Sequence, residues 1–161
     1  HSPSFTSLFM QLRTLSIAFL SITVLIAGCT HKVQDAQHPQ FGKEAWVGVA
    51  ALSGVNNASV NGAATGHFFA DGTFVERVQL NVEPLASTQD YGVWLLGATE
   101  ADRVFLGFLQ NATKDVRHSL TANKKQDLTA FSTVSITIQP QGKSDVPGKE
   151  IARGTVKGIQ K

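Results

Sequence analysis

The sequence predicts an all-β domain, an antiparallel β-sandwich of about eight short strands, and three observations favour this fold class. Apolar and polar residues alternate in several short segments, most cleanly in residues 133–138 (Thr-Val-Ser-Ile-Thr-Ile). Gly, Asn, Asp and Ser gather between these segments, where turns are expected. No long segment has the apolar spacing of an amphipathic helix. A chain of 161 residues has room for one such domain.

The clearest local signal is a hairpin. Asp71-Gly72 joins residues 66–70 to residues 73–82, and an Asp-Gly pair between two strand-like segments is typical of a tight turn. In the second arm Val78 alternates with polar residues, and its face, shared by Leu80 and Val82, is expected to point into the core.

The remaining strands follow from the same alternation. A first strand is expected over residues 44–52, followed by a Ser-, Asn- and Gly-rich loop over 53–63. Within the last long segment Val134, Ile136 and Ile138 are expected to point inward. Five further strands are predicted over residues 91–96, 104–109, 116–120, 127–138 and 150–156.

The N-terminal segment has the order of a signal peptide. Met10, the single methionine, is followed by Arg13, an apolar run over residues 15–26 and then Ala27-Gly28-Cys29. The apolar run is short for a membrane span, which needs roughly 20 apolar residues, so cleavage is favoured. If the segment is not cleaved, the same run would serve as a membrane anchor.

Leu25-Ile26-Ala27-Gly28-Cys29 resembles the lipobox of bacterial lipoproteins. The resemblance implies cleavage between Gly28 and Cys29, a diacylglyceryl group on the Cys29 sulfur and an acylated (palmitate-type) new amino terminus. A buried or incidental cysteine is the alternative.

The predicted organisation is therefore in four parts. Residues 1–9 are interpreted as leader residues, 10–28 as the lipoprotein signal peptide, 29–42 as a polar tether and 43–161 as the β-sandwich domain. Thr30 is not the aspartate that in many enteric-type bacteria marks inner-membrane retention, so an outer membrane is favoured if the host has one. The expected location is the extracytoplasmic side of the bacterial envelope, in the periplasm of a host with two membranes.

Composition and motifs speak against several function classes. A formal net charge of +2 without a basic stripe makes nucleic acid an unexpected partner, and a single cysteine excludes an internal disulfide. His67 and His118 lack metal-ligand spacing, and Ser119 beside His118 points to the opposite face of a strand. We therefore expect no catalytic residues, no metal and no cofactor, and the chain is predicted not to be an enzyme.

From residue 62 to 154 the chain resembles the extracytoplasmic C-terminal domain of anti-sigma-K factors. The resemblance rests on the Asp-Gly hairpin, Val82-Glu-Pro-Leu85, Tyr91-Gly-Val-Trp94-Leu-Leu-Gly97, the Leu106-Gly107-Phe108 segment and the closing stretch 135–154. Two departures stand out: Gln139 replaces a common glutamate, and Gly148 follows Pro147 without the family's threonine. The zinc-binding cytoplasmic module of such factors is not encoded in this sequence.

A candidate partner-binding surface is predicted at Tyr91, Trp94 and the loop that contains Gly142, Pro147 and Gly148. The two aromatic residues combine a large apolar area with a polar tip, although both also suit a core, and Tyr91 suits a corner hydrogen bond. The loop is the most distinctive in the chain, although a rigid connector between two strands would use the same residues.

The predicted function is a lipid-anchored extracytoplasmic sensor or interaction module without a sigma-binding half. Its expected partners are the membrane, through the lipid on Cys29, and an envelope protein or glycan. Two alternatives stay open: a structural envelope lipoprotein, and a protein that binds or acts on a glycan.

Overall fold

The computed structural model describes residues 37, 38, 40–99 and 101–161. The predicted signal peptide, Cys29 and most of the tether lie outside the described residues. The apolar core that follows is built entirely from residues between Trp46 and Val156.

Within the described residues the fold is all-β and antiparallel, as the sequence predicted. The strands are β1 (Gln37–His38), β2 (Gly42–Gly54), β3 (Asn61–Phe69), β4 (Phe74–Asn81), β5 (Gln89–Leu96), β6 (Arg103–Phe108), β7 (Arg117–Lys124), β8 (Thr133–Pro140), β9 (Lys149–Thr155) and β10 (Lys157–Gln160).

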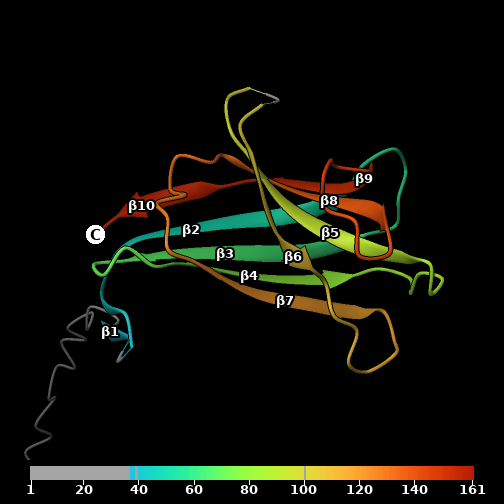
Figure 1. Cartoon of the computed structure of the whole chain (residues 1–161), viewed down its shortest axis with the longest axis horizontal. Coiled ribbons are helices and arrows are strands. Elements are labelled where there is room, and N and C mark those ends of the chain that lie inside the picture. The colour runs from blue at the N-terminus through green and yellow to red at the C-terminus, as the bar shows by residue number, and fades with distance from the viewer. Residues whose placement is uncertain (1–36, 39, 100) are drawn as a thin grey trace, which may run out of the picture. The chain divides into compact units, whose positions relative to one another are not determined.

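The strands form one continuous ladder rather than two separate sheets. Its order is β6-β5-β8-β9-β2-β3-β4-β7, and β1 and β10 add to β2. The ladder curls so that β5 and β6 cross in front of β3, β4 and β7 (Figure 1). Its two ends meet through one bridge, Gln110 to Ser119, which nearly closes the sheet into a barrel.

Most predicted strands are confirmed, and the differences lie at their ends. The hairpin turns at Asp71-Gly72 as predicted, with the Asp71 carboxylate accepting the Thr73 backbone N–H at 2.9 Å. The strand β3 starts at Asn61, so the loop predicted over residues 53–63 is shorter. Residues 127–132 precede β8 as a connection. A turn forms there at Thr129 and Ala130, where Asp127 Oδ1 accepts the Thr129 N–H and the Leu128 carbonyl accepts the Phe131 N–H.

Two strands were not predicted. The strand β10 continues β9 after Val156 and pairs with β2 from Val49↔Lys157 to Trp46↔Gln160. The strand β1 pairs with the start of β2. Both are short, and pairing with β2 rather than a local pattern creates them.

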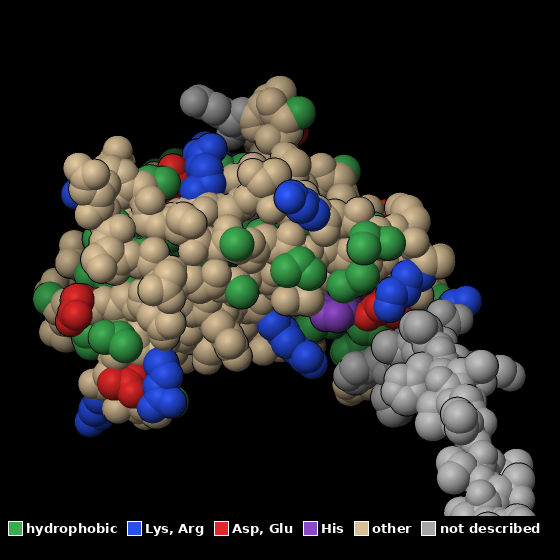
Figure 2. All heavy atoms as spheres, turned by 180° about the vertical axis from the view of Figure 1, so that it is seen from behind, with side chains coloured by type: hydrophobic (Ala, Val, Ile, Leu, Met, Phe, Trp, Pro, Cys, Tyr) green, Lys and Arg blue, Asp and Glu red, His purple; other side chains and the backbone are tan. Residues whose placement is uncertain are grey.

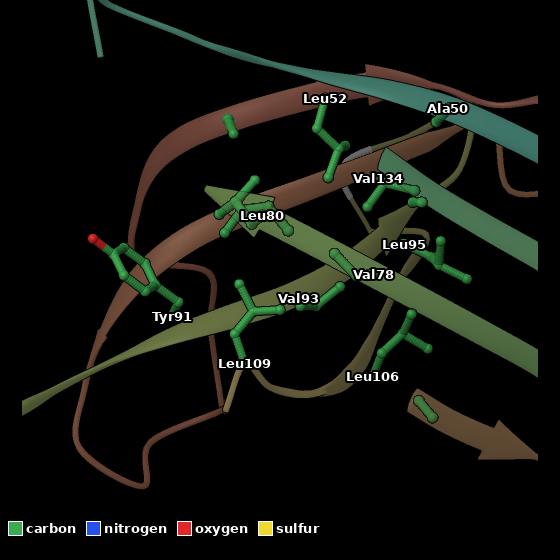
Figure 3. Packing of buried hydrophobic residues seen from close by; sticks show 14 of the residues in the cluster. Ala50, Leu52, Val78, Leu80, Tyr91, Val93, Leu95, Leu106, Leu109 and Val134 are labelled. Carbon is green, nitrogen blue, oxygen red and sulfur yellow. The ribbon is translucent and has the colours of Figure 1, made fainter. Parts of the chain in front are cut away.

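The core lies between the two facing halves of the ladder. Val78 and Leu80 of β4 meet Val93 and Leu95 of β5 and Val134 of β8 (Figure 3). All five side chains are at most 1% exposed. As predicted, Val134 and Ile136 point inward, and Ile138 packs against the same cluster.

A carboxyl group also faces this core. Glu76 lies between Phe74 and Val78 on the inward face of β4, in register with Gly66 and Ala122, and is 3% exposed. A Cβ atom on Gly66 would lie 2.6 Å from Glu76 Oε2, so glycine leaves the space that this carboxyl group fills. Glu76 has no ion pair among the described residues, and burial raises its pKa to about 8.

Candidate functional site

The predicted site residues Tyr91 and Trp94 lie on opposite faces of β5. Tyr91 points into the core, is 6% exposed and donates its hydroxyl to the backbone oxygen of Glu83 at 2.7 Å. This is the corner hydrogen bond that the sequence offered as one role for this tyrosine. Burial raises the pKa of the Tyr91 phenol, and the Glu83 carboxylate adds to the rise.

Trp94 lies on the side of the sheet away from the core but is also buried, with 3% of its surface exposed. Its ring packs against Phe105 with the ring centroids 4.9 Å apart. The indole Nε1 donates to the hydroxyl of Thr137 at 3.1 Å. The neighbouring strands β6 and β8 therefore hold the indole in one orientation.

Gln139 connects this buried cluster to the loop between β8 and β9. The Thr137 hydroxyl donates to Gln139 Oε1 at 2.9 Å. The other end of the amide donates to two loop carbonyls, those of Val146 at 2.8 Å and Lys143 at 3.2 Å. Because Gln139 is 1% exposed, one buried amide braces the loop from below.

The glycines of the loop are required by this arrangement. The Gly148 N–H also donates to Gln139 Oε1, and a Cβ atom at Gly148 would lie 2.0 Å from the carbonyl oxygen of Ile138. Gly142 adopts φ +69° and donates its N–H to Asp90 Oδ2 at 2.8 Å. The loop is thus fixed near both of its ends.

The outer end of the braced loop borders a groove of about 500 Å³. Leu96, Val146 and Pro147 supply apolar surface, and Arg103 and Arg153 supply charge. We call this the Val146 groove. The Val146 side chain is 61% exposed, although its backbone carbonyl is held by Gln139.

The two arginines of the Val146 groove differ in their partners. Arg153 Nε donates to Glu150 Oε1 at 2.9 Å, and the same oxygen accepts the Ser135 hydroxyl at 2.5 Å. Arg103 has no ion pair among the described residues. The groove therefore combines apolar surface with one guanidinium group held in place and one left available.

The structure brings four of the predicted residues together and leaves one apart. Trp94, Gly142, Pro147 and Gly148 belong to the braced loop or to the cluster beneath it, whereas Tyr91 faces the core. Whether these residues bind a partner stays a prediction. Arg103 and Arg153 were not predicted from the sequence. Each is a single cationic residue in a different strand, and nothing in the local pattern indicates that the two lie in one groove.

The two histidines discussed above have structural partners. His67 Nδ1 lies 2.5 Å from Glu44 Oε2, and Lys161 donates to the other oxygen of Glu44. Burial alone would raise the pKa of Glu44, but hydrogen bonds from Lys161 and His67 lower it overall. His118 is buried, with Nδ1 3.1 Å from the Val116 carbonyl and Nε2 3.2 Å from the Asn111 amide.

Neither a metal cluster nor a spanning helix is found in the described part of the chain. No three His, Cys, Asp or Glu side chains gather there in a way that could hold a metal ion. No helix among those residues is long and apolar enough to cross a membrane.

Comparison with known proteins gives one family. Individually curated proteins gave no significant match. The family model described as "Anti-sigma-K factor rskA, C-terminal" matches residues 15–156, which begin at the first residue of the N-terminal apolar run and end after β9. Because the match covers most of the sequence, the chain belongs to the family of the anti-sigma-K factor RskA C-terminal domain.

Proposed function

We propose that this chain is a lipid-anchored, nonenzymatic interaction module on the extracytoplasmic side of the bacterial envelope, and that it binds a protein partner through the Val146 groove. Family membership supports a regulatory rather than a metabolic role. The lipobox-like sequence that ends at Cys29 supports the anchor. The observation that carries the proposal is the exposed valine on a loop that a buried amide braces.

This combination suits recognition because binding a partner then costs little conformational entropy at this surface. An exposed apolar side chain gains free energy when it is covered, and a loop that is already fixed loses little conformational entropy on binding.

The composition of the groove indicates the partner's chemistry. Leu96, Val146 and Pro147 suit an apolar side chain, and the available Arg103 guanidinium suits a carboxylate next to it. The proposed partner is an envelope protein that presents an apolar residue beside an acidic one.

The anchor is tested first by mass and by membrane partitioning. The wild-type chain, expressed in a bacterium, is expected to lose the residues before Cys29, gain the mass of acyl chains and enter the detergent phase, whereas Cys29→Ser does neither. A wild-type protein that keeps its N-terminal segment without lipid would refute the anchor. The apolar run over residues 15–26 would then act as an uncleaved membrane segment.

The binding site is tested by photo-crosslinking in living cells. A photoreactive residue in place of Val146 is expected to capture one discrete partner, and Arg103→Glu in the same chain is expected to abolish that product. Val49, which is 51% exposed on the other half of the sheet, is the matched control position. Equal crosslinking from both positions would contradict the proposal.

A structural envelope lipoprotein remains the alternative, and it predicts a different pattern. In that case Val146→Asp and Arg103→Glu leave envelope integrity unchanged, whereas Cys29→Ser impairs it. Under the proposed function the groove variants reproduce the regulatory defect of a deletion.

A further inference from the structure

A second groove lies over β3, β4 and β7, on the outer face of the opposite half of the sheet. It has a volume of about 560 Å³ and runs between the strands and the loop that follows β6. Four amide side chains and two hydroxyls line it: Asn61, Gln79, Asn81, Gln110, Thr113 and Ser119. We call this the amide groove.

The amide groove is close to electrically neutral. Its cationic side chain, Arg117, donates from Nε and Nη2 to Asp115 Oδ2 at 2.9 and 2.7 Å. The Asp115 carboxylate also accepts the Thr113 hydroxyl and the Arg117 backbone N–H, and these contacts, the Arg117 side chain first, lower its pKa. Seen from behind, this half of the molecule is mostly uncharged, with charged side chains near its margins (Figure 2).

The amide groups of the groove present donors and acceptors next to one another. Asn81 Nδ2 donates to Asn61 Oδ1 at 2.9 Å, which orients both groups and leaves the Asn61 NH₂ as a donor and Asn81 Oδ1 as an acceptor. Gln79 and Ser119 have no side-chain hydrogen-bond partner among the described residues. Around them Ala63 and Ala112 are small, and Leu80, the large apolar side chain of the lining, is only 1% exposed.

These properties exclude other classes of ligand. The backbone of β4 is paired on both sides, with β3 and β7, so its middle offers no free edge to which a peptide strand could add. Nucleic acid would need cations that are free to contact phosphates, and Arg117 is held by Asp115. An apolar peptide anchor would need exposed apolar surface to pack against, and the large apolar side chain of the lining, Leu80, is already buried.

We propose that the amide groove binds a neutral oligosaccharide that carries acetamido groups. Sugar hydroxyls both donate and accept, as do the paired amides of the groove. An acetamido group offers one N–H and one C=O, which match the acceptor and the donor that the Asn61–Asn81 pair leaves free. This site is independent of the Val146 groove and does not require the lipid anchor.

The test is a calorimetric titration of the full chain, in a detergent without a sugar headgroup, with chitotetraose, a neutral chain of four N-acetylglucosamine units. We expect saturable binding that Gln79→Ala and Asn81→Ala each weaken about tenfold, through the loss of one or two hydrogen bonds. Asn123→Ala, which removes an exposed amide from β7 outside the groove, is expected to bind like wild type.

Three results would overturn the proposal. The first is no binding by the wild-type chain. The second is binding that Gln79→Ala and Asn81→Ala weaken no more than the control Asn123→Ala does. The third is equal binding of cellotetraose, which lacks acetamido groups, or of the neutral peptide Gly-Ser-Gly-Ser. Chemical-shift changes of the Asn and Gln side-chain amides in the wild-type chain report the site without any variant, in case a variant fails to fold.

Discussion

Replacing Glu76 by glutamine is expected to remove a large pH dependence of stability. The Glu76 carboxyl group faces the core without an ion pair among the described residues, and its pKa in the folded chain is about 8. Glutamine has nearly the same shape and stays neutral at every pH. The variant therefore isolates the cost of burying the charged form.

The direction of the effect follows from the two pKa values of Glu76. In the unfolded chain the group titrates near its ordinary value of 4.5, and in the folded chain near 8. Above pH 4.5 the unfolded chain releases a proton that the folded chain retains. The stability of the wild type is therefore full below that pH and falls as the pH rises towards 8.

The magnitude follows from the size of the shift in the pKa of Glu76. Each pKa unit corresponds to about 1.4 kcal/mol, so a rise from 4.5 to about 8 gives a total loss near 5 kcal/mol. The wild type is expected to be less stable than Glu76→Gln by about 1 kcal/mol at pH 5, about 3 kcal/mol at pH 7 and about 4 kcal/mol at pH 8. Such a loss is a large fraction of the roughly 5–15 kcal/mol that stabilises a domain.

Urea unfolding at pH 5, 7 and 8, followed by tryptophan fluorescence, measures this difference. Trp46 and Trp94 are 6% and 3% exposed, so unfolding moves both indoles into water. Glu83→Gln, which changes an exposed glutamate, is the matched control and is expected to keep the wild-type pH profile. A constant difference between wild type and Glu76→Gln across this pH range would refute the reasoning.

Three further predictions concern the loop and its surroundings. Gln139→Leu leaves two loop carbonyls without donors and is expected to lower the free energy of unfolding by about 2–4 kcal/mol, measured with urea. Gly148→Ala brings a methyl group against the carbonyl oxygen of Ile138 and is expected to raise hydrogen exchange across the loop; unchanged exchange would contradict the close approach. Tyr91→Phe removes the hydrogen bond to the Glu83 carbonyl and is expected to lower the free energy of unfolding by about 1–2 kcal/mol, measured with urea. An unchanged free energy of unfolding would mean that this hydrogen bond does not stabilise the fold.

Local sequence patterns were sufficient to predict most strands and one turn. Alternation of apolar and polar residues depends on the two-residue period of a strand, so Val78, Val134 and Ile136 could be assigned to the core without a structure. The Asp71-Gly72 turn could be assigned because an Asp-Gly hairpin involves only neighbouring residues.

The candidate sites depended on contacts that no local pattern contains. Trp94 meets Thr137 across 43 positions of the sequence, and Gln139 braces a loop whose residues alone also suited a simple connector. Asn61 pairs with Asn81 only because β3 and β4 lie in register. Alternation tells which face a residue occupies, but not which residues of other strands share that face.

The sequence by itself determined that the domain is all-β and that alternating residues such as Val78, Val134 and Ile136 point into its core. The tertiary structure alone decided that the strands form one ladder, that the Glu76 carboxyl group is buried without an ion pair among the described residues, and that two separate grooves form on the outer faces. The reason is physical. Strand period and turn chemistry act over a few residues, whereas the pairing order and the burial of a single carboxyl group are set by the packing of the whole sheet.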